Sequence, residues 1–148
     1  MNREEFYART MHTPDDPERA AQRASLREIS RLLLPLHRSL IEAARADFAL
    51  AYSEVQKPSH LLHLLNEHPF FAWLKPMTSL IVDIDEMSRV DFEPQQFEEI
   101  VRRVEALVGN GAGSDFAGHY LPMLQRDVDM AIAHAALRQA LMRIANAR

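Results

Sequence analysis

The sequence contains no cysteine and only four glycines, and both shortages exclude whole classes of protein. Without cysteine the chain has no disulfide bond, no thiolate nucleophile and no cysteine-based zinc site. Three of the four glycines fall within Gly109–Gly113, so neither a dinucleotide-binding glycine fingerprint nor a P-loop is present. The lack of cysteine also suits the cytoplasm, where we expect the protein to be located.

The chain also lacks a long apolar run and a surplus of basic residues. No apolar stretch reaches the length of a membrane span, and the first residues, MNREEFYART, are charged. The formal net charge is −4, and residues 83–105 alone hold eight acids and three arginines. Such an acidic segment repels phosphate groups. We therefore expect neither a nucleic acid nor a membrane as a partner.

What the sequence does contain is the composition of one ordinary globular domain. The 148 residues are 47% apolar and 26% charged, which is enough for a core of its own. Apolar residues recur with a helical period, and the central stretch shows no period-two alternation. We predict an N-terminal arm over residues 1–15 and a single all-α domain over residues 16–148. This domain is predicted to be a bundle of five to seven helices, several of them bent or split at internal prolines.

The most apolar stretch, HPFFAWLKPMTSLIVDIDEM at residues 68–87, is predicted to be the central helix of the bundle. Pro69 suits the first turn of a helix, where its missing N–H is not needed. Pro76 should kink this helix or divide it near Lys75. At 100° per residue the following side chains share one broad face: Phe70, Trp73, Leu74, Met77, Leu80, Ile81, Ile84 and Met87.

Capping residues and prolines mark the other helices. Asp15 or Asp16 before Pro17 is a good helix start, Ser59 can cap a short helix, and Asp127 can cap the last one. Pro35 and Pro122 lie inside predicted helices and should bend or split them. The predicted ranges are 17–52, 60–67, 94–108, a helix that starts at residue 114 or 115 and contains Pro122, and 128–145.

Two histidines lie within apolar stripes and are the best candidates for chemistry. His37 and His134 each sit among leucines, and a buried imidazole needs partners for both nitrogens. Asp83 or Asp85 is able to supply one, although Asp85 also has Arg89 at the i,i+4 position. Two readings stay open. Each histidine is a hydrogen-bonded core or interface residue, or both converge with an aspartate on a small ligand, on Fe, Mn or Zn, or on a proton-transfer site.

A second set of possible metal ligands lies on the short helix at residues 60–67. His63 and Glu67 have the spacing that places a histidine and a carboxylate one turn apart, which di-iron bundles use. The four leucines of this helix, at positions 61, 62, 64 and 65, define its buried side. His60, His63 and Glu67 then share the polar side, where we expect at most adventitious capture of a metal ion.

The lack of common catalytic motifs and the surplus of large apolar residues favour a protein that acts by association rather than an enzyme. The sequence has no G-x-S-x-G and no HExxH motif. Large apolar side chains exceed what one helix stripe normally buries, and Phe71 and Val82 lie off the main face of the central helix. We therefore expect a homodimer or an unidentified protein partner, with no cofactor. The surplus consists of Phe6, Tyr7, Phe70, Phe71 and Trp73.

One resemblance covers most of the chain, from Leu33 to Leu141. The stretch HPFFAWLKPMTSLIVDIDEM, followed by FAGHYLPMLQRDVDMAIAHAALR, resembles a group of uncharacterised bacterial proteins. In that group the pattern aromatic-aromatic-Ala-Trp-Leu-basic-Pro precedes a helix with Ile-Asp-Glu. The resemblance implies a bacterial, all-helical chain that forms a complete domain. It implies no activity, and no functional residue follows from it.

Overall fold

A computed structural model describes residues 16–109 and 113–147, and within these ranges all regular secondary structure is helical. It has six α-helices, one 3-10 helix and no strand there, so the predicted all-α, single-domain bundle is confirmed. The predicted arm at residues 1–15 lies outside the described residues. The elements are α2 (Pro17–Ala51), α3 (Pro58–Glu67), η1 (Pro69–Leu74), α4 (Lys75–Arg89), α5 (Pro94–Val108), α6 (Asp115–Arg126) and α7 (Val128–Asn146).

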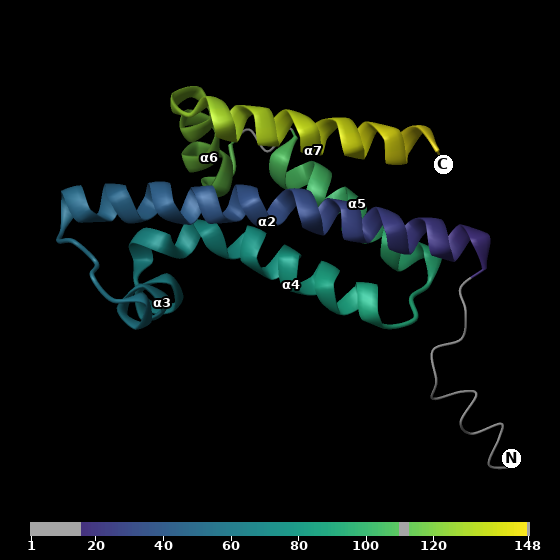
Figure 1. Cartoon of the computed structure of the whole chain (residues 1–148), viewed down its shortest axis with the longest axis horizontal. Helices are drawn as coiled ribbons and strands as arrows, with labels where there is room; N and C mark the ends of the chain where they lie inside the picture. The colour runs from purple at the N-terminus through teal and green to yellow at the C-terminus, as the bar shows by residue number, and fades with distance from the viewer. Residues whose placement is uncertain (1–15, 110–112, 148) are drawn as a thin grey trace, which may run out of the picture.

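The helix that organises the bundle is α2, not the central stretch that the sequence favoured. It is 35 residues long, and Asp16 caps it by accepting a hydrogen bond from the backbone N–H of Arg19 at 2.7 Å. Figure 1 shows α4 and α7 lying along opposite sides of α2. Every third or fourth residue of α2 is buried and forms the middle of the core, namely Leu26, Ile29, Leu33, Leu36, Leu40, Ala44 and Phe48.

The internal prolines have different effects on the helices that hold them. Pro76 lies in the first turn of α4, directly after η1, so the predicted division near Lys75 is confirmed. Pro35 and Pro122 remain inside α2 and α6, so of the two predicted effects, a bend or a split, the split does not occur there. Both prolines are solvent-exposed. Water can therefore bond the carbonyl that each proline leaves without its helical partner.

The start of the central stretch is a 3-10 helix, and this changes which aromatic side chains are buried. A 3-10 helix turns about 120° per residue, so the faces of an α-helical wheel do not apply to η1. Phe71, expected off the main face, is fully buried, whereas Phe70 is half-buried. Phe71 is therefore no surplus surface residue, and that part of the argument for a dimer was wrong. The rings of Phe48, Tyr52, His68, Phe70 and Phe71 form one cluster with centroid distances of 4.8–5.9 Å.

The short helix α3 is packed less completely than its four leucines suggest. Only Leu64 is buried, and Leu62 is 61% exposed. The helix begins at Pro58 after Lys57, which makes no side-chain capping bond, so the predicted cap at Ser59 was wrong. Its main packing partner is η1. This arrangement leaves apolar surface of α3 facing the space beside α2 and α4.

Candidate functional site

His37 lies on α2 and is half-buried, at the edge rather than the centre of the core. Its Nε2 is 2.9 Å from Oγ1 of Thr78 on α4. The Thr78 hydroxyl donates its own hydrogen to the Leu74 carbonyl at 3.2 Å, so it accepts from His37 and the imidazole carries its proton on Nε2. Burial lowers the pKa of His37, because the charged imidazolium loses hydration there.

His134 lies on α7 and pairs with a different hydroxyl. The hydroxyl of Tyr120 on α6 is 2.7 Å from Nδ1 of His134. Tyr120 is buried and has no second hydrogen-bond partner in the described ranges, so its phenol donates to the imidazole. Burial raises the pKa of Tyr120 above its usual range. Burial, together with the nearby Arg138 charge, lowers the pKa of His134, so the pair is neutral at pH 7.

The two aspartates are bound to arginines rather than to imidazoles. Asp83 on α4 pairs with Arg103 on α5 at 2.8 Å. Asp85 pairs with Arg89 at 3.0 Å, as its i,i+4 position predicted. His37, His134 and these aspartates therefore each have a separate partner, and the structure pairs neither imidazole with Asp83 or Asp85. Among residues 16–109 and 113–147, no three His, Asp or Glu side chains gather so as to hold a metal ion.

The second set of possible metal-binding residues is exposed to solvent, as the sequence predicted. His60, His63 and Glu67 all lie on α3 and are exposed. No ion pair or hydrogen bond joins their side chains within the described residues. They form part of the solvated side of this helix.

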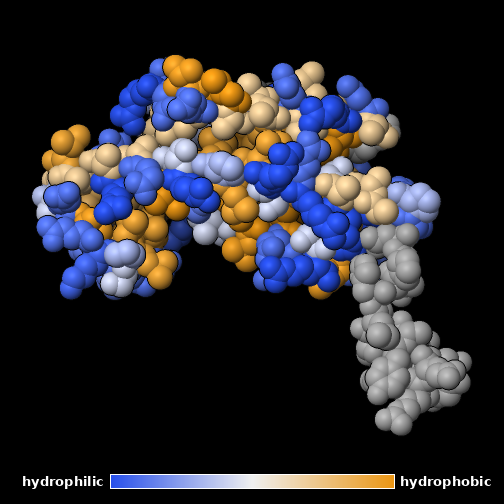
Figure 2. Space-filling view, viewed as in Figure 1, coloured by the Kyte–Doolittle hydropathy of each residue, from blue (hydrophilic) through white to orange (hydrophobic). Residues whose placement is uncertain are grey.

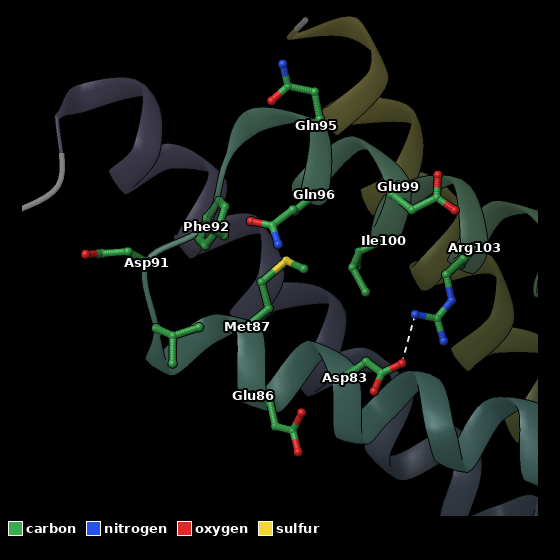
Figure 3. A pocket seen from close by; sticks show the side chains of 11 residues that line it. Asp83, Glu86, Met87, Asp91, Phe92, Gln95, Gln96, Glu99, Ile100 and Arg103 are labelled. Carbon is green, nitrogen blue, oxygen red and sulfur yellow. Dashed lines mark ion pairs between the residues drawn. The ribbon is translucent and has the colours of Figure 1, made fainter.

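A large hollow of the described surface lies between α4 and α5, where Figure 3 looks into it. It has a volume of about 700 Å³ and an apolar floor made by Met87, Phe92 and Ile100. Val90, at the end of the floor, is half-exposed. The carboxylates of the rim are those of Asp83, Glu86, Asp91 and Glu99, with Arg103 as the single base. We call this hollow the α4–α5 groove.

A buried arginine fixes one wall of the α4–α5 groove. Arg23 of α2 donates hydrogen bonds to the backbone carbonyls of Ser88, at 2.6 Å, and Val90, at 3.1 Å. Its guanidinium lies 5.1 Å from the centre of the Phe92 ring, and that of Arg19 lies 4.9 Å away. The connection between α4 and α5 is thus held in place. The sequence signal for Arg23 was its position three residues before Leu26, within the apolar stripe of α2.

The last helix, α7, is apolar on two opposite faces. Its inner face buries Met130, Leu137, Ala140, Leu141 and Ile144. On the opposite side Val128 is 74%, Ile132 63% and Met142 60% exposed. Figure 2 shows hydrophobic atoms at the upper edge of the molecule, where α6 and α7 lie. The exposed residues recur at alternating steps of four and three, a pattern that the sequence reading missed, and they are Val128, Ile132, Ala135, Gln139 and Met142. We call them the α7 outer stripe.

No helix of the described ranges is both long enough and apolar enough to cross a membrane. No family model, no curated protein and no solved structure matches the chain. The resemblance to bacterial proteins therefore stays an expectation.

Proposed function

We propose that this protein is non-enzymatic and acts by association, forming a homodimer through the α7 outer stripe. The observation that carries the proposal is that the outer side of α7 exposes three large apolar side chains, Val128, Ile132 and Met142, whereas a helix at a free surface normally presents a polar face to water. An exposed apolar stripe of this kind marks an interaction surface. The proposal places the protein in the bacterial cytoplasm and assigns it no cofactor.

The spacing of the α7 outer stripe indicates that its binding partner is another helix, namely α7 of a second copy of the chain. Steps of four and three residues are those of a helix–helix seam, in which apolar side chains of two helices interlock. A two-fold axis places the middle of the stripe against itself, and the small Ala135 there lets two α7 backbones approach closely. The 19 residues of α7 give a seam about 28 Å long.

A single introduced cysteine tests this seam, because the chain has no cysteine of its own. Ala135→Cys, at the middle of the α7 outer stripe, is expected to give a disulfide-linked dimer under mild oxidation. Leu50→Cys is the matched control, since Leu50 on α2 is 88% exposed and lies outside the stripe. Equal cross-linking at both positions would show only random collision and would reject the seam.

A specific observation favours a second role, the binding of another protein at the α4–α5 groove. The groove combines an apolar floor with four carboxylates at its rim. Three of them pair with arginines, Asp83 with Arg103, Glu99 with Arg102 and Asp91, at 3.9 Å, with Arg23. The complementary occupant is a basic amphipathic helix, with an apolar face for the floor and Lys or Arg for the rim. Because Arg23 holds the wall in place, little reorganisation is required on binding.

A helical peptide of leucine and lysine, compared with its leucine–glutamate counterpart, tests this second role. We expect the lysine peptide alone to bind the full chain, with an affinity that falls as salt rises. Reversing two rim charges in Glu86→Lys/Asp91→Lys should weaken binding about tenfold or more, while Glu54→Lys, an exposed acid outside the groove, should not. Equal binding by the two peptides would reject a charge-matched groove.

The rival proposal is a bundle that binds a metal ion or a small ligand through its histidines. Its metal form, with Fe, Mn or Zn, draws on His37, His134, Asp83 and Asp85, which have separate partners in the structure. Its small-ligand form has more support, because one of these histidines lines a pocket.

A further inference from the structure

A pocket of about 460 Å³ surrounds His37, between α2, α3 and α4. It exists because α3 packs mainly on η1 and leaves Leu62 61% exposed beside it. The apolar part of the lining is entirely aliphatic and contains no aromatic ring, and it consists of Ile41, Leu62, Leu65 and Leu74. Its size lies within the range of ordinary small-molecule sites. We call it the His37 pocket.

The polar part of the His37 pocket contains basic and neutral groups but no carboxylate. Asn66, Lys75, Thr78 and Ser79 complete the lining. Lys75 makes no ion pair with any residue that the structure describes, and Nδ1 of His37 has no partner there either. Lys75 is one of only two lysines in a chain of net charge −4. A basic pocket without acids is therefore a local exception on an acidic protein.

We propose that the His37 pocket binds an aliphatic monocarboxylate. The carboxylate pairs with the ammonium of Lys75 and takes hydrogen bonds from two neutral donors of the lining, the Asn66 amide and the Ser79 hydroxyl, while His37 stays neutral. The alkyl chain covers Leu62 and Leu65, whose apolar surface α3 leaves open. A single lysine matches a single negative charge, and the aliphatic lining matches an alkyl chain rather than a ring. The inference is independent of the dimer and of the α4–α5 groove, which lie elsewhere on the molecule.

Calorimetric titration of the full chain with octanoate and decanoate, both below their micelle concentrations, tests the ligand class. We expect one saturable site, with affinity rising about fourfold for each added methylene. Decylamine, which has the same chain and the opposite charge, should not bind because it meets Lys75. Lack of saturation by decanoate up to about millimolar concentration, or equal binding of decylamine, would overturn the proposal.

The two lysines of the chain give a matched pair of variants that locate the site. Lys75→Gln should weaken decanoate binding about three- to tenfold and leave binding of the neutral decanamide unchanged. Lys57→Gln, outside the pocket, should change neither. Leu62→Asn should weaken both ligands, and because Leu62 is exposed this variant should fold.

Two outcomes of the variant series would contradict the site. Equal effects of Lys75→Gln and Lys57→Gln would show a non-specific charge effect rather than a bound carboxylate. Unchanged binding in Leu62→Asn would place the alkyl chain somewhere else. Ile132→Glu, designed against the dimer, should bind decanoate as the wild type does, so that failure of the dimer proposal and failure of the ligand proposal are separable.

Discussion

The hydroxyl of Tyr120 lies 2.7 Å from Nδ1 of His134 and joins α6 to α7 across the edge of the core. Tyr120 is buried, and Phe116 stacks on its ring at a centroid distance of 5.0 Å. The pair thus satisfies a polar group that the fold removes from water. In this arrangement His134 is the hydrogen-bond acceptor of the buried phenol.

Tyr120→Phe should lower the free energy of unfolding by about 1 kcal/mol, because Nδ1 of the imidazole loses the hydrogen bond from the phenol. The corresponding fall in Tm is about 3 °C, measured by thermal denaturation. Tyr52→Phe is the control, since Tyr52 is exposed. A Tyr120→Phe variant as stable as the control would show that the hydrogen bond contributes nothing.

Stability should fall as the pH is lowered through the range in which histidines titrate. Burial lowers the pKa of both His37 and His134. Near and below pH 6.5, the ordinary pKa of a histidine, the unfolded chain therefore binds more protons than the folded one. The stability that their neutral forms provide is complete above that value and is lost as the pH falls toward the folded pKa.

Urea denaturation at about pH 7.5 and about pH 5.5 measures this dependence. We expect the pH dependence to be smaller in His37→Gln/His134→Gln than in the wild type. The exposed pair His60→Gln/His63→Gln serves as the control. If the double variant kept the full dependence of the wild type, other groups would account for it.

Arg23→Met should destabilise the protein by about 2 kcal/mol, because it leaves the carbonyls of Ser88 and Val90 without their donor. Arg38→Met, on the exposed side of α2, is the matched control and should be nearly neutral. Chemical denaturation compares the two variants. Equal stability would mean that Arg23 does not hold the connection between α4 and α5.

Protein purified without a tag should carry no stoichiometric Fe, Mn or Zn when measured by plasma mass spectrometry. The reason is that His37 and His134 bind hydroxyl groups, while Asp83 and Asp85 bind arginines. About one equivalent of metal per chain would contradict this prediction and support the rival proposal of a metal-binding bundle. Loss of that metal in His37→Gln or His134→Gln would then identify the ligand.

Helix positions were predictable because capping residues and apolar periods act locally. Asp16 and Asp127 cap α2 and α7 through their own side chains, as the sequence indicated, and Ser114 caps α6, whose start was predicted at residue 114 or 115. The 3-10 geometry of η1 was not predictable from periodicity, and it moved Phe71 from the expected surface into the core. Local sequence signals thus predicted where the helices lie, but not in every case which side chains of a helix are buried.

The candidate sites depended on tertiary contacts that a sequence does not display. An apolar stripe predicts that His37 and His134 face the bundle, but not that Thr78 and Tyr120 meet them. Arg23 lies in the stripe of α2 and reads as a surface cation, because its carbonyl partners are more than sixty residues away. The second apolar face of α7 has a visible spacing, but only the packing shows which face is free.

Light scattering during size-exclusion chromatography, at high micromolar concentration, tests the proposed dimer most directly. We predict a mass of twice the 17.0 kDa chain for the wild type and for Leu50→Glu, and the mass of one chain for Ile132→Glu. Leu50 and Ile132 are both exposed, but only Ile132 belongs to the α7 outer stripe. A monomeric wild type at this concentration, or a dimer that persists in Ile132→Glu, would contradict the account.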